Sequence, residues 1–169
     1  MSDHDAALRQ LVDRDSIKTV IADYGLYYDS GDFESFTSLF TADATYDITP
    51  DPGLFPVPVT GRDAIVGAMA ERWNITADTS GSSPRHMSTN ISIRELTHSA
   101  AHVFSFLLVC FVHPDGNCEI RRSGTYVDRF RKEEAGWLFT SRHLHLFNVP
   151  DRGVITGSPP ACSRPSGAD

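Results

Sequence analysis

The chain has 169 residues, 40% of them hydrophobic and 22% charged, which fits one globular domain with its own core. Its formal net charge is −7 and it has no extended basic cluster, which excludes nucleic acid as an expected partner. Three cysteines lack metal-like spacing, the acidic N-terminal segment has no apolar core, and no apolar run has membrane-spanning length. We therefore expect a cytoplasmic protein with no membrane association.

Two helices are predicted at the start of the chain. Gly31 lies where the first helix would end, and Asp32 can cap a short second helix that runs through Phe40. The first helix is predicted over residues 5–28, with residues 15–16 as a candidate break. Its apolar residues recur at helical spacing: Leu8, Leu11, Val12, Ile17, Val20, Ile21, Tyr24, Tyr27 and Tyr28.

The middle of the chain alternates between short elements and loops. Residues 45–48 are predicted to form a strand, and residues 50–59 a loop, because four prolines fall within them. A third helix opens at residues 60–63 and runs to about Trp73. Residues 74–84 are rich in Ser, Thr and Gly and are predicted to form a mobile loop.

The second half of the chain is predicted to be β-structure. Short turn sequences separate four long strands at residues 87–96, 101–113, 119–132 and 137–148. Such strands favour an antiparallel meander, and helices followed by a meander make an α+β domain. We expect one domain over residues 1–148 and a tail over residues 149–169. A strongly curved sheet over the helices would form a cone with a closed apolar base and an open, ligand-binding mouth.

Asp29 and His86 are the candidate catalytic pair. Asp29 ends the first predicted helix, where a carboxylate is unfavourable beside the negative end of the helix dipole and needs a compensating positive charge. His86 lies at the head of a predicted strand. If the fold brings the two together, the carboxylate can orient the imidazole and stabilise its charged form, which suits general acid–base chemistry.

Three tyrosines and an asparagine are candidate substrate-binding residues. Tyr24, Tyr28 and Tyr46 could each donate a hydrogen bond to a substrate oxygen, although a buried tyrosine often serves only in packing. Asn90 lies four residues beyond His86 and so on the same face of an ideal strand, where it could hold a polar substrate group or make a structural hydrogen bond.

His143 is a further candidate for lining a ligand pocket. His143 and His145 share one face of the last predicted strand, and paired imidazoles are one way to hold a metal. No carboxylate lies at a matching spacing, so we expect no metal. A place on the surface of the sheet is the alternative for both histidines.

Five short motifs, in order, resemble the nuclear-transport-factor-2-like superfamily. The first two resemble its opening, the third its third helix, and the last two its later strands. They are Tyr28-Asp29-Ser30-Gly31-Asp32-Phe33, Leu39-Phe40-Thr41-Ala42-Asp43-Ala44, Gly61-Arg62-Asp63-Ala64-Ile65, Arg85-His86 and Gly136-Trp137-Leu138-Phe139 with Arg142. The resemblance covers about residues 10 to 147 and implies a cone of three helices under a curved, mostly antiparallel sheet.

Within that superfamily the chain looks most similar to the SnoaL-like branch, which includes scytalone dehydratase, hexachlorocyclohexane dehydrochlorinase and bile-acid 7α-dehydratase. The resemblance implies that Asp29 and His86 remove a proton and expel a leaving group, with Tyr28 and Tyr46 in the pocket. It also implies a homodimer or homotrimer. Scytalone dehydratase has a second pocket histidine where this chain has a Phe or Val, so its substrate is not implied.

The leading hypothesis is a lyase or isomerase that needs no cofactor and acts on a hydrophobic polycyclic or aromatic small molecule. Dehydration, double-bond migration and cyclisation share the same proton abstraction, so the sequence leaves them open. Two alternatives are a non-catalytic subunit, such as the small subunit of a ring-hydroxylating dioxygenase, and a protein that binds an apolar ligand. The superfamily contains members without catalysis, so the fold alone does not choose between them.

Overall fold

The computed structural model describes residues 3–53, 55–80 and 83–147. The tail predicted over residues 149–169 lies outside the described residues. The elements, in chain order, are α1 (Asp3–Ser30), α2 (Phe33–Thr37), β1 (Phe40–Thr49), β2 (Val59–Thr60), α3 (Arg62–Ser80), β3 (Ser83–Leu96), β4 (Ala100–Val112), β5 (Cys118–Glu133) and β6 (Gly136–Leu146).

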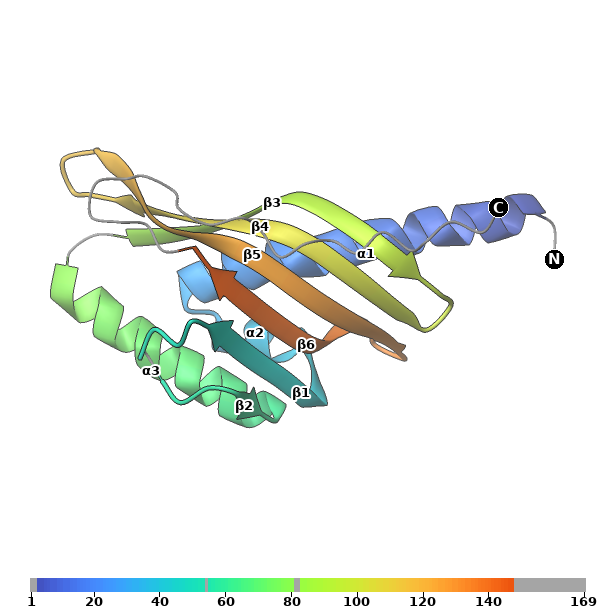
Figure 1. Cartoon of the computed structure of the whole chain (residues 1–169), viewed down its shortest axis with the longest axis horizontal. Helices are drawn as coiled ribbons and strands as arrows, with labels where there is room; N and C mark the ends of the chain where they lie inside the picture. The colour runs from blue at the N-terminus through green and yellow to red at the C-terminus, as the bar shows by residue number, and fades with distance from the viewer. Residues whose placement is uncertain (1–2, 54, 81–82, 148–169) are drawn as a thin grey trace.

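The strands form one mixed sheet in the order β2-β1-β6-β5-β4-β3. Every neighbouring pair is antiparallel except β1 and β6, which run parallel. Figure 1 shows the long strands curving as a layer, with α1 running along β3 and α3 lying beside β1. The predicted α+β cone of three helices and a mostly antiparallel curved sheet is confirmed.

α1 is one unbroken helix, so the predicted break at residues 15–16 is wrong. The Ser16 hydroxyl donates to the Val12 carbonyl at 2.9 Å, and the Asp15 carbonyl accepts the Thr19 hydroxyl at 3.1 Å. Residues 15 and 16 therefore take part in hydrogen bonds within the helix instead of ending it. The N-terminal turns extend past the sheet (Figure 1). Three apolar residues of that part are therefore exposed rather than buried: Leu8, Leu11 and Val12.

The turn from α1 into α2 follows the predicted signals. Gly31 has φ +73°, a conformation that favours glycine, and a Cβ there would lie 2.9 Å from the Trp73 ring. The Asp32 carboxylate accepts from the Ser35 amide at 3.0 Å and caps α2. α2 ends at Thr37 rather than Phe40, because the Leu39 carbonyl already accepts the Phe139 amide of β6 at 2.9 Å.

α3 is longer than predicted and replaces most of the expected loop at residues 74–84. It continues to Ser80. Its extension contains polar residues but no glycine or proline until Gly81, so nothing in it stops a helix. The prediction failed because Ser, Thr and Asn are frequent in loops yet are tolerated in helices that other elements support.

The core lies between the helices and the concave face of the sheet. On β4 the buried side chains of Val103, Leu107 and Val109 alternate with the more exposed Phe104, Phe106 and Leu108. Four phenylalanines pack together at the closed end of the cone: Phe36, Phe40, Phe130 and Phe139. Among the described residues, no helix is long and apolar enough to cross a membrane.

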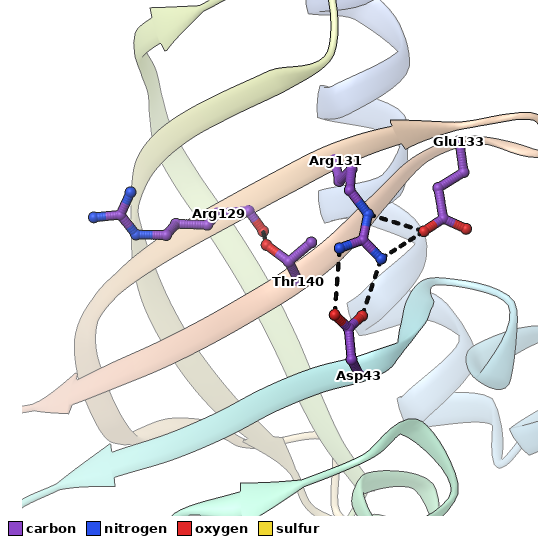
Figure 2. Close-up of polar contacts among 5 residues, drawn as sticks. All are labelled: Asp43, Arg129, Arg131, Glu133 and Thr140. Carbon is purple, nitrogen blue, oxygen red and sulfur yellow. Dashed lines mark hydrogen bonds and ion pairs between the residues drawn. The ribbon is translucent and has the colours of Figure 1, made fainter.

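An exposed ion-pair cluster joins β1 to β5. The Arg131 guanidinium donates to both Asp43 oxygens, at 3.0 and 3.3 Å, and to Glu133 at 2.7 and 3.0 Å (Figure 2). Hydrogen bonds from Arg131 hold the pKa of the Asp43 carboxyl down at about 2. In the same view the Arg129 side chain extends away from this cluster.

Candidate active site

The Asp29 carboxylate is held by both of its oxygens against His86. Oδ1 of Asp29 lies 2.5 Å from Nδ1 of His86, and Oδ2 accepts the His86 backbone amide at 2.6 Å. The two side chains are 11% and 19% exposed, so the pair is shielded from bulk water. A carboxylate acceptor at Nδ1 places the imidazole proton there and leaves the Nε2 lone pair as the site for accepting another proton.

Gly25 allows this contact to form. It lies one helical turn before Asp29, on the α1 face that packs against β3. A Cβ at position 25 would lie 2.5 Å from the backbone oxygen of His86, closer than a side chain can approach. Because the obstructing atom belongs to the backbone, α1 reaches β3 only when this residue is glycine. Glycine within a helical pattern can signal such a close approach in a sequence.

A cavity of about 330 Å³ opens beside the pair. It is lined by both members of the pair and by residues from α1, α3, β1, β3, β4, β5 and β6. Phe55, from the proline-rich segment, and Pro84, at the start of β3, also line it. The tyrosines predicted for substrate binding are all among the lining residues: Tyr24, Tyr28 and Tyr46. The fold therefore brings five of the seven candidate site residues to one cavity.

Three buried tyrosines lie together at the inner end of the cavity. Tyr24, Tyr46 and Tyr126 all line it, and the rings of Tyr24 and Tyr126 meet edge-to-face at a centroid distance of 6.1 Å. Burial raises the pKa of Tyr24 and Tyr46 well above the ordinary tyrosine value, so both hydroxyls stay protonated and can donate. Burial also raises the pKa of Tyr28 to about 12, and its ring meets the His86 ring edge-to-face at a centroid distance of 5.0 Å.

Beneath the tyrosines lies a fully buried ion pair, Arg142 with Asp128. Nε of Arg142 is 3.4 Å from Oδ1 of Asp128, and both side chains are 0% exposed. The guanidinium carbon lies 3.9 Å from the ring centroid of Tyr24 and 3.6 Å from that of Tyr126. This cation opposes the rise that burial causes in the pKa of both tyrosines, which makes their hydroxyls stronger hydrogen-bond donors.

Asn90 does not lie in the cavity, contrary to the prediction. The pairing of β3 with β4 shifts between Thr89 and Ser92, and Asn90 lies in this bulge with φ +52° and an exposed side chain. The inserted residue breaks the alternation of faces along β3. Counting by two from His86 therefore assigns Asn90 to the wrong face.

His143 also lies outside the cavity, for the same physical reason. Phe130 pairs with Phe139 but Arg129 pairs with Ser141, so Thr140 is an extra residue in β6. The shift turns Arg142 and Leu144 inward. His143 lies 2.9 Å from the Thr49 hydroxyl and 3.7 Å from Asp47, and its ring stacks on His145 at a centroid distance of 4.0 Å. In the part of the chain that the structure describes, no three His, Cys, Asp or Glu residues are grouped to hold a metal.

Most of the other cavity-lining residues were not predicted as site residues from the sequence, among them two on β5 and two on α3. Tyr126 and Arg122 lie on the inward face of β5, and Arg72 and Trp73 on α3. An aromatic residue in an alternating strand was the available signal for Tyr126. Trp73 was predicted only as the approximate end of the third helix, and the two arginines carried no signal because most arginines are solvated.

Comparisons with known proteins agree with the fold described above. An NTF2-like protein with a cystatin-like fold from Novosphingobium aromaticivorans is 25% identical, with a TM-score of 0.73 over 89% of this chain and 92% of that one. A second protein of that organism, provisionally assigned as a scytalone dehydratase, is 24% identical, with a TM-score of 0.68 over 92% and 97% of the two chains. ActVI-ORFA of Streptomyces coelicolor is 20% identical, with a TM-score of 0.66 over 79% and 96%.

No curated protein matches the chain significantly. The family described as the SnoaL-like domain matches residues 9–143, which is most of the chain and includes the Asp29–His86 pair. The chain therefore belongs to the SnoaL-like domain family.

Proposed function

We propose that the protein is a lyase or isomerase that needs no cofactor and removes a proton next to a carbonyl of a hydrophobic, ring-bearing small molecule. The observation that carries this proposal is the 2.5 Å contact between Nδ1 of His86 and Oδ1 of Asp29 in the wall of an open cavity. An imidazole with an acceptor carboxylate on one nitrogen is a general base on the other. Family membership adds support, because SnoaL-like proteins include dehydratases and cyclases.

In the proposed reaction, Nε2 of His86 takes the substrate proton. The Asp29 carboxylate stabilises the imidazolium that forms and keeps the ring in position through its second bond to the His86 amide. The electron pair left on carbon moves toward the carbonyl oxygen, where hydroxyls of the cavity tyrosines can donate hydrogen bonds. The imidazolium then returns the proton to a leaving hydroxyl in a dehydration, or to another carbon in an isomerisation.

The cavity also bears on the non-catalytic alternatives. A scaffold subunit has no need of an open cavity, whereas here about 330 Å³ remains unfilled beside a titratable pair. A simple carrier would need the apolar walls. It would not need a carboxylate that makes two hydrogen bonds to a histidine. Perturbed or paired titratable groups in a cleft are more typical of catalysis.

The experiment is a turnover screen with the full chain. Cyclic β-hydroxyketones, enones and polyphenolic ketones are incubated in D₂O, and mass spectrometry measures both loss of water and uptake of deuterium at the carbon next to the carbonyl. We expect at least one class to react with the wild type and not with His86→Ala. Exchange that is equally fast with both proteins, or tight binding of a ligand with neither exchange nor turnover, contradicts the proposal.

A further inference from the structure

The charge of the cavity wall differs from that of the whole protein. The chain carries a net charge of −7, yet three arginines line the cavity, from three separate elements: Arg72 on α3, Arg85 on β3 and Arg122 on β5. Among the described residues of the wall, Asp29 is the one carboxylate, and it is bonded to His86. Cations therefore outnumber anions at this site in an otherwise acidic protein.

Two of these arginines lie where a ligand would meet them. Arg122 is exposed, but the register pairs it with Val109, whose side chain is buried on the concave face. Arg72 is half-buried, and its charge opposes the rise that burial causes in the pKa of Tyr28. The guanidinium of Arg72 is thus near the part of the cavity that holds the catalytic pair. Arg85 is exposed and donates to the Pro84 carbonyl at 2.8 Å.

Apolar side chains make up most of the remaining wall. They include Trp73, Phe55, Leu107, Phe111, Leu144 and Leu146. A ligand that fills this space needs an apolar body. Polar or charged lining groups then fix its orientation. At the solvent side of this cavity the orienting groups are the exposed arginines, which are cations. The tyrosines are buried at its inner end.

We propose that the ligand of this cavity is an amphipathic acid, with an apolar ring body against the aromatic wall and an anionic group at the mouth held by Arg122 and Arg72. The proposal rests on the proposed function and names the substrate class for the same site. A planar guanidinium matches a carboxylate or a phosphate with paired hydrogen bonds. A neutral ligand would cover the exposed Arg122 without offering it an acceptor, which disfavours its binding.

A carboxylate and a phosphate are two sources of the same anionic chemistry. A free carboxylic acid would place its own group at the mouth. A substrate carried on a phosphorylated group would place a phosphate there instead. Either fits a pair of arginines, so the test must compare the two anions on one apolar body.

The test is a calorimetric titration of the full chain with three probes that share a naphthalene ring: 2-naphthoate, methyl 2-naphthoate and 2-naphthyl phosphate. We expect one or both anions to bind about tenfold more tightly than the ester at low salt, and 0.5 M NaCl to reduce this preference. The tighter anion identifies the source of the charge.

The matched variants are Arg122→Gln and Arg129→Gln. Both residues are exposed arginines of β5, but Arg129 does not line the cavity. Arg122→Gln should weaken anion binding about threefold to tenfold and leave ester binding unchanged, whereas Arg129→Gln should change neither. Equal affinity for acids and ester, including no binding of any probe at millimolar concentration, would overturn the proposal. An equal effect of the two substitutions would do the same.

Repeating the titration with His86→Ala separates this proposal from the proposed function. The preference for anions should persist in that variant, because it depends on the arginines and not on the base. If the preference is present but no acid is ever turned over, the ligand class stands and the reaction fails. If neutral ketones react and acids do not bind, the reaction stands and the ligand class fails.

Discussion

Asp29 acts on His86 through two bonds, one to the ring and one to the backbone. Both partners on His86 are N–H donors, so the residue at position 29 must accept on both of its side-chain atoms. An asparagine keeps the shape but turns an N–H₂ group toward one donor. The negative charge and the second acceptor are therefore lost together, and a conservative substitution should be damaging.

Asp128 should make stability depend on pH. Burial raises its pKa to about 7 from 3.8, partly opposed by Arg142. Between these values the folded chain binds a proton that the unfolded chain lacks, so the free energy of unfolding falls as pH rises from about 4 to 7. Relative to the Asp128→Asn variant, whose amide does not titrate, the wild type should lose about 3 kcal/mol across that range.

Urea denaturation of both proteins at pH 4, 5.5 and 7 measures this difference. Asp43→Asn is the control, because the pKa of Asp43 is lowered to about 2 and this carboxyl titrates below the tested range. A wild-type minus Asp128→Asn difference that stays constant from pH 4 to 7 would show that Asp128 is ionised throughout, as a tight ion pair with Arg142.

At the scale of the elements, the sequence predicted helices and strands well and strand faces poorly. The pairing of Asp29 with His86 follows from where α1 ends and where β3 begins. Helical periodicity and Gly31 indicated the end of α1, but β3 begins at Ser83, four residues before the strand predicted over residues 87–96. The faces of Asn90 and His143 depend instead on single inserted residues in β3 and β6. A bulge inverts every later position in a strand, and its sequence signal is weak.

The contact between α1 and β3 gives the clearest prediction at this scale. Gly25→Ala would place a Cβ 2.5 Å from the His86 backbone oxygen, so α1 must move away from β3. We expect a loss of about 1–3 kcal/mol in unfolding free energy and a marked loss of turnover, because the Asp29–His86 contact opens with the helix. Chemical denaturation and a rate measurement on one substrate check both effects.

Gly67→Ala is the matched control for that substitution. Gly67 is also a helical glycine, in α3, but nothing lies within 4 Å of its Cβ position. The same change there should raise stability by about 0.5–1 kcal/mol and leave turnover intact. If the two variants behave alike, the close approach of α1 to β3 is not what positions the Asp29–His86 pair.

At the scale of the whole molecule, the curved sheet has two faces with different tasks. Its concave face encloses the core and the cavity. Residues far apart in sequence meet there because β1, the first strand, pairs with β6, the last. Sequence analysis predicted this architecture through the order of its elements. It did not predict the buried Arg142–Asp128 pair, since the inward position of Arg142 depends on the bulge in β6.

The convex face carries apolar side chains, which leads us to propose self-association. Phe106 is 37% exposed and Met87 is 41% exposed, with Phe104 and Leu108 beside them on β4. Light scattering should give a mass at least twice the 18.6 kDa of one chain, and Phe106→Glu should lower it. Leu26→Glu, at an exposed position of α1, is the control and should not change the mass. A single-chain mass for the wild type at all concentrations rules this face out as an interface between copies.

The central claim is that Asp29 and His86 work as one unit on a substrate proton. The most direct measurement is a double-mutant cycle of kcat/KM with Asp29→Asn, His86→Ala and the double variant, on a substrate found by the turnover screen. Each single variant should lose about 10²- to 10⁴-fold, and the double variant should be little worse than either, because residues that act together are not additive. Losses that multiply in the double variant, or a His86→Ala variant with full activity, would contradict the account.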